Sequence, residues 1–149
     1  MKSGFTLFEL LVVMVIMAIL STMSYRSYQH WLQWNRLQTN ADRILQAVQL
    51  TRRLALTKKI TASCEFNQRE IVIHDDMDNR HIILQGKPVK LSWIGSGSRS
   101  HAKPILAFDM DGSTRGQQGS VRLCMRGLSN GKRIVVNHAG RAYIADLAC

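Results

Sequence analysis

The chain has 149 residues, about one domain's worth, and 20 basic against 10 acidic side chains give it a formal net charge of +10. An apolar fraction of 46% with only 2 Pro and 10 Gly predicts a folded chain and excludes collagen-like, low-complexity and disordered classes. The length disfavours a multidomain enzyme, and the charge favours an anionic partner such as nucleic acid, lipid headgroups or an acidic protein.

The first element in chain order is an apolar run from Phe5 to Met23. Its 19 residues carry one charge, and as a helix they would extend about 28 Å, close to the ~30 Å hydrocarbon core of a bilayer. The run therefore predicts a membrane-spanning helix. A cleaved secretory signal fits poorly, because the polar residues that follow lead into more helix-forming sequence rather than to a small-residue cleavage site.

Glu9 is the single charged residue within this run. An ionised carboxylate in hydrocarbon costs at least ~2.5 kcal/mol on insertion scales, so it requires a cationic partner. No Lys or Arg lies between Lys2 and Arg26, so the same helix offers none. We therefore expect the partner to be an α-amino group on a neighbouring copy or a related chain.

The N-terminal sequence MKSG followed by FTLFE, residues 1–9, resembles the type III signal of type IV pilins and type II secretion pseudopilins. The resemblance implies that prepilin peptidase cuts after Gly4, that Phe5 becomes an N-methylated terminus, and that the Phe5 amine of one subunit pairs with Glu9 of another. It divides the chain into a leader at 1–4, a transmembrane and filament-core helix at 5–24, and a globular domain at 25–149. The bacterial inner membrane would hold the subunit, with its globular domain in the periplasm, before it enters the filament.

The rest of the chain predicts one long helix and then short strands. No Gly or Pro lies between Phe5 and Gly86, so the helix is expected to run from Phe5 to Thr57. Residues at spacings of three and four predict that its second half is amphipathic and lies on a core: Trp34, Leu37, Ala41, Ile44, Val48, Thr51 and Ala55. Short β-branched runs separated by turn sequences then predict an antiparallel sheet: 60–66, 70–74, 81–85, 89–93, 104–109, 120–125, 133–137 and 141–146. The expected fold class is α+β, with the type IV pilin-like fold that the resemblance implies.

The C-terminal part of the chain, from residue 105 on, resembles a narrower group within this superfamily. Segments 105–112, 121–124 and 133–137, the pair at 140–141 and the last residue resemble the GspH/FimT group, and the cysteines resemble FimT and FimU minor pilins more than GspH pseudopilins. The resemblance implies a minor pilin that joins other minor and major pilins at a type IV pilus tip and primes assembly. The alternative within the same superfamily is a type II secretion minor pseudopilin of the GspH type.

Three cysteines are an odd number for a domain that faces an oxidising compartment, so one is expected to be unpaired or to pair between chains. Of the three possible bridges we favour Cys124–Cys149, because it would tie down the C-terminal strand. Closing a loop of about 25 residues would stabilise the fold by roughly 3 kcal/mol. Cys64 lies within a predicted strand and is expected to be a buried thiol.

Catalytic and metal-binding patterns are weak in this sequence. The acidic segments 75–79 and 109–112 lack the later Glu and the flanking helices of an EF-hand, so hairpin turns are favoured over calcium sites. The chain has no CxxC pair, and its histidines show no HExxH spacing. It also has no GxSxG motif and no phosphate loop. We therefore expect no enzymatic activity, no cofactor and no metal.

The positive charge is concentrated in two stretches, 26–59 and 99–141, each with a net charge of +6. In the second stretch Lys103, Arg133 and Arg141 are candidate DNA-binding residues, because cations near turns can contact a phosphate backbone without sequence preference. Some FimT relatives bind DNA for natural transformation through a C-terminal Gly-Arg-x-Arg element. Residues 140–143 read GRAY, in which Tyr143 replaces the second Arg. A DNA receptor is therefore the second functional hypothesis, and solvated turn charges are the alternative to it.

Overall fold

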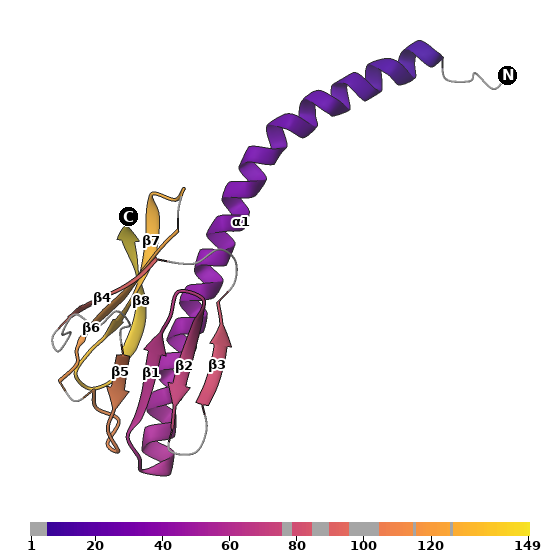
Figure 1. The fold of residues 1–149 in the computed structure, drawn as a ribbon. Coiled ribbons are helices and arrows are strands. Elements are labelled where there is room, and N and C mark those ends of the chain that lie inside the picture. The colour runs from indigo at the N-terminus through magenta and orange to yellow at the C-terminus, as the bar shows by residue number, and fades with distance from the viewer. Residues whose placement is uncertain (1–5, 76–78, 85–89, 96–104, 115, 126) are drawn as a thin grey trace. The chain divides into compact units, whose positions relative to one another are not determined.

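The computed structural model describes residues 6–75, 79–84, 90–95, 105–114, 116–125 and 127–149. Within these ranges it contains one helix and eight strands (Figure 1). The chain divides into two compact units, Met1–Trp34 and Asn35–Cys149, and the helix contributes to both. The elements are α1 (Leu7–Lys58), β1 (Ala62–Phe66), β2 (Glu70–His74), β3 (Asn79–Ile83), β4 (Lys90–Gly95), β5 (Ile105–Phe108), β6 (Gly119–Cys124), β7 (Asn130–Val136) and β8 (Ala142–Ala148).

Helix α1 has nearly the predicted bounds. At its start, the Glu9 amide donates a hydrogen bond to the Thr6 hydroxyl at 3.3 Å, which is the contact of an N-cap residue. At its end, Lys59 adopts a left-handed conformation with a φ of 55°, a common way for a helix to stop. The cap and the left-handed residue together account for where the helix begins and ends.

In the first unit, the apolar side chains of α1 are exposed on all sides. Every large apolar side chain from Leu7 to Leu20 is between 39% and 85% exposed. Tyr28 and Trp31, one turn apart, are also exposed and stack with ring centroids 6.0 Å apart. Within the described residues, no helix combines the length and the hydropathy that a membrane crossing needs. The membrane span expected at 5–24 is thus not confirmed.

In the second unit, one stripe of α1 is buried as predicted. Leu37, Ala41, Ile44 and Val48 are fully buried, as are the two later stripe positions, while Trp34 is only half-buried. Two further helix residues, Asn40 and Ala47, are also fully buried and widen the stripe. The buried stripe is therefore wider than the sequence predicted.

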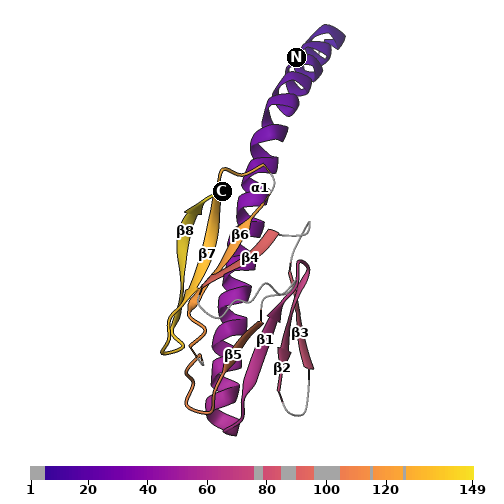
Figure 2. The same cartoon turned by 60° about the vertical axis from the view of Figure 1, so that its left-hand side comes forward.

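The eight predicted strands are present, and they form two sheets rather than one. The first sheet has the order β3-β2-β1-β5 and the second β4-β6-β7-β8, with every neighbouring pair antiparallel. In both views the first sheet lies along the second half of α1, with the second sheet beside it (Figures 1 and 2). The expectation of a single sheet was wrong because a β-rich run predicts a strand but not its neighbour: β5 pairs with β1, not with β4.

The inward faces of both sheets supply the core. Alternate residues are buried in β1, β5 and β6 and in the second half of β7, as expected for sheets with one covered face. Arg43 of α1 also donates a hydrogen bond to the Ile83 carbonyl of β3, and Lys58 forms an ion pair of 2.8 Å with Asp75 after β2. The buried residues are Ala62, Cys64, Phe66, Ile71, Ile73, Leu106 and Phe108 in the first sheet and Val121, Leu123, Ile134 and Val136 in the second.

A junction near the end of α1 joins two turns to the helix. Arg52 Nε donates a hydrogen bond to the Gly112 carbonyl at 3.1 Å, in the turn after β5. The Thr114 amide donates to the His138 carbonyl at 3.2 Å, in the turn between β7 and β8. Gly140 of that second turn is buried directly against the Gly112 carbonyl. A turn is present at 109–112, with a hydrogen bond of 2.8 Å from the Gly112 amide to the Asp109 carbonyl, but the expected hairpin was wrong because β5 pairs with β1 and β6 lies in the other sheet.

Candidate functional site

The residues predicted for processing and assembly lie at the chain's N-terminus. Gly4 and Phe5 are outside the described residues. Glu9 lies in the first turn of α1, exposed, with exposed Leu7, Phe8 and Leu10 around it in the sequence. Among the described residues its carboxylate has no ion-pair partner, so the carboxylate is available to a cation from elsewhere.

The structure contains a disulfide between Cys124 and Cys149, the pair that the sequence favoured. Cys124 ends β6 and Cys149 follows β8, with the two Cα atoms 5.9 Å apart. The bridge crosses over Gly131 of β7, where a Cβ would lie 2.3 Å from the Cys149 sulfur and 2.3 Å from the Leu123 carbonyl oxygen. Only a residue without a side chain fits beneath it.

Cys64, the third cysteine, is a buried free thiol in β1, as expected. Burial raises its pKa to about 12, because the thiolate would lose its hydration, while a hydrogen bond with Thr51 of α1 partly opposes this effect. The thiol is therefore protonated at neutral pH and is packed as a small apolar side chain.

Two of the three predicted DNA-binding residues can be placed. Lys103 lies outside the described residues, whereas Arg133 in β7 and Arg141 just before β8 are both exposed. Arg133 is opposite Ala145 of β8, and the Asn137 amide donates to the Arg141 carbonyl at 3.0 Å, continuing the ladder. Because side chains alternate along β8, Arg141, Tyr143 and Ala145 face the same side as Arg133. The register therefore brings the two arginines to one outward face.

Arg122 in β6 belongs to this face and was missed by the sequence analysis. It lies directly opposite Arg133, and its Nε is buried with no hydrogen-bond partner among the described residues. The alternation of Val121, Arg122 and Leu123 was the available signal, since it places Arg122 away from the core. We call this outward surface of the second sheet the arginine face; it comprises Ser92, Ile94, Arg122, Arg133, Val135, Arg141 and Tyr143.

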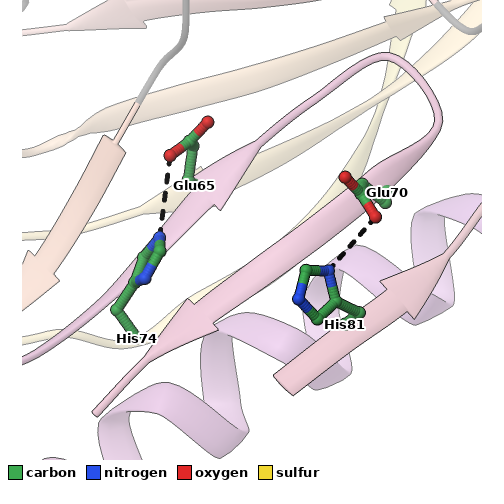
Figure 3. A network of polar contacts seen from close by, with 4 residues as sticks. All are labelled: Glu65, Glu70, His74 and His81. Carbon is green, nitrogen blue, oxygen red and sulfur yellow. Dashed lines mark hydrogen bonds and ion pairs between the residues drawn. The ribbon is translucent and has the colours of Figure 1, made fainter. Parts of the chain in front are cut away.

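The outward surface of the first sheet carries two glutamate–histidine contacts (Figure 3). His74 Nε2 lies 3.6 Å from Glu65 Oε2, and His81 Nδ1 lies 3.2 Å from Glu70 Oε2. No group of three or more His, Cys, Asp or Glu in the described parts of the chain is arranged to hold a metal ion. We call this surface the glutamate face; it comprises Glu65, Glu70, Val72, His74, His81, Ile83 and Ile105.

The N-terminal sequence and the fold are each similar to those of known proteins. Residues 1–25 match the prokaryotic N-terminal methylation motif. The fold is similar to the crystal structure of the type IV minor pilin FimU of Pseudomonas aeruginosa, with a TM-score of 0.61 over 77% of this chain and 92% of that chain. The chain has a type IV pilin-like fold. Its sequence identity to FimU is 15%, and no curated protein matches it in sequence.

These similarities confirm two sequence predictions: the methylation-type N-terminus and the α+β fold with a long N-terminal helix. The matched motif includes Gly4, Phe5 and Glu9. Their separate roles in cleavage, methylation and subunit pairing stay predictions.

Proposed function

We propose that the chain is a minor pilin, a non-catalytic subunit of a type IV pilus that assembles with other minor and major pilins. The observation that carries this proposal is the methylation motif at 1–25 on a chain with a FimU-like fold. At the pilus tip such a subunit would prime assembly and support extension. Its folded unit would present surfaces to neighbours, without a reaction centre.

Assembly would depend on the first unit of α1. Apolar side chains exposed on every side of a helix must be covered by lipid or by other protein, because their hydration is unfavourable. Prepilin peptidase would remove residues 1–4, the inner membrane would hold the helix before assembly, and neighbouring helices would cover it in the filament. In that low-dielectric setting the methylated Phe5 amine of one subunit would neutralise Glu9 of another and set their register.

The Glu9→Gln variant tests this proposal. We expect its leader to be removed and Phe5 to be methylated normally, as measured by mass spectrometry of the mature chain. Its incorporation into sheared pili should fall by roughly tenfold or more, the effect of losing about 1.4 kcal/mol or more of pairing energy. Asp111→Asn, at an exposed turn carboxylate, is the matched control and should incorporate normally. Normal incorporation of Glu9→Gln, or native protein that retains residues 1–4, would contradict the proposal.

The alternative assignment is a GspH-type minor pseudopilin of a type II secretion system. The two assignments differ in the assembly that recruits the chain. Deleting the gene and measuring both surface piliation and secretion of exoproteins separates them: a minor pilin predicts lost piliation with intact secretion, and a pseudopilin predicts the reverse.

DNA binding for natural transformation is a second candidate function, favoured by the shared outward face of Arg133, Arg141 and Tyr143. Arginines would contact phosphates, Tyr143 would stack on an exposed base, and Lys103 would add a further cation. The test is DNA binding by the full chain in detergent across salt concentrations. Arg133→Ala and Arg141→Ala should each flatten the log–log salt slope by about one unit, and Arg53→Ala, on exposed α1 surface, should not. Equal effects of all three substitutions would leave no specific site.

A further inference from the structure

We propose that the two outward sheet faces are the two halves of one contact between copies of this chain. The glutamate face of one protomer would dock on the arginine face of the next. This inference rests on the proposed function for its biological setting, a filament of pilin-like subunits. It concerns only the second unit and needs neither leader cleavage nor the apolar part of α1.

The arginine face requires an anion that the described chain does not supply. Arg122 and Arg133 are directly opposite each other on neighbouring strands, an arrangement in which like charges destabilise a sheet. Neither has an ion-pair partner among the described residues, and Arg122 Nε is buried without a hydrogen bond. A carboxylate offered from outside would offset the repulsion between the two arginines, because a guanidinium can donate two parallel hydrogen bonds to it.

The glutamate face offers a carboxylate of this kind in Glu70, whose side chain is 41% exposed, whereas that of Glu65 is 17% exposed. The two residues lie on the adjacent central strands β1 and β2, in contact with His81 and His74 (Figure 3). They lie in the stretch 60–98, whose net charge is −1 in a chain of net charge +10. A guanidinium is always charged and binds a carboxylate through two parallel hydrogen bonds, so it would be a stronger partner than a histidine.

The two faces also match in their layout. On the first sheet the edge strands β3 and β5 carry Ile83 and Ile105, which are 69% and 46% exposed and lie opposite Glu70 and Glu65. On the second sheet the edge strands β4 and β8 carry Ile94 and Tyr143, which are 48% and 56% exposed. Each face thus has charges on its central strands and exposed apolar residues on its edges, and the charges have opposite signs. Arginine and aromatic residues beside apolar ones are typical of protein interfaces.

A second copy of the chain explains more of these features than DNA does. A nucleic acid would neutralise Arg122 and Arg133 but would give the exposed Ile94 no apolar partner. It would also leave the glutamate face unused. A contact between unlike faces is heterologous, so each copy can use its arginine face with one neighbour and its glutamate face with another, as a filament requires.

Charge-reversal variants of the full chain in detergent test the contact. Arg133→Glu disables the arginine face and Glu70→Arg disables the glutamate face; both side chains are exposed, so both variants should fold. We expect each variant alone to self-associate at least about tenfold more weakly than the unmodified chain in sedimentation analysis. Arg53→Glu, on exposed α1 surface, is the matched control and should associate normally.

Mixing the two variants gives the decisive measurement. Arg133→Glu retains its glutamate face and Glu70→Arg retains its arginine face, and the two reversed charges are again opposite in sign, so a mixture should recover the association that each variant alone has lost. Absence of association in the mixture, or unchanged self-association of either variant, would overturn the contact. So would a chain that is monomeric alone and whose Arg133→Glu variant loses only DNA binding. Glu9→Gln separates this inference from the proposed function, because it should lower pilus incorporation while leaving the contact between sheets intact.

Discussion

Replacing Gly140 with alanine is expected to lower the free energy of unfolding by roughly 3 kcal/mol, from a backbone conformation unfavourable to L-residues plus a steric clash. Gly140 has a φ of 72°, and a Cβ there would lie 2.2 Å from the Gly112 carbonyl oxygen and 2.9 Å from Arg52 Nε. The Gly112 carbonyl accepts the hydrogen bond from Arg52, so it cannot move away without breaking the junction with α1. The clash therefore acts on the helix and on both turns together.

Gly116→Ala is the matched control for this substitution. Gly116 has a nearly equal φ of 77°, but no atom lies within 4 Å of a Cβ built there. The Gly116→Ala variant should lose only the part of the unfolding free energy that comes from the backbone conformation, about 1 kcal/mol. Urea unfolding of both variants, followed by circular dichroism, measures the difference. Equal losses would show that the close approach of Gly140 to the junction contributes nothing to stability.

Replacing both Cys124 and Cys149 with serine is expected to lower the free energy of unfolding by about 3 kcal/mol, since the unfolded chain regains the entropy of an open loop. The bridge spans 25 residues and holds the end of β8, an edge strand that pairs only with β7. Little of β8 is buried, so besides the bridge its end is held mainly by backbone hydrogen bonds, up to that from the Cys149 amide to the Ser129 carbonyl. Hydrogen exchange should accelerate most at the amides of β8.

A reducing agent supplies the control for the cysteine prediction. Reduction of the unmodified protein should reproduce the loss in unfolding free energy, and the serine variant should not respond to the same treatment. Cys64 is already a free thiol, so the reagent has no bond to reduce there. A reductant response that persists in the serine variant would contradict the assignment of the stabilisation to this bridge.

The elements were predictable from local pattern, whereas their arrangement was not. The helix stripe around Leu37 and Ile44 repeats every three or four residues, and each predicted strand run overlaps an observed strand. Bounds moved where a partner strand extends the ladder: β3 begins at Asn79 because Asn79 pairs with His74. The division into two sheets depends on the pairing of β5 with β1, which no local pattern records.

The same distinction holds for the candidate sites: residues of a local motif were predictable, and a residue that matters through strand register was not. The assembly residues were predictable because Gly4, Phe5 and Glu9 form a short motif in a fixed position ahead of an apolar run. Arg122 was missed because a single arginine inside a strand is common, and its significance comes from lying opposite Arg133. Whether these two arginines lie opposite each other depends on the register between β6 and β7, and the turn between the two strands sets that register.

The exchange of β4 and β5 between the sheets has a consequence for how the protein folds and resists unfolding. After β3 the chain crosses to the second sheet with β4, returns to the first with β5, and crosses again for β6 to β8. Neither sheet can be completed before the chain has crossed between them, so folding depends on distant contacts and should be slow. Once formed, the two layers are joined by three chain crossings, so we expect them to unfold as one cooperative unit.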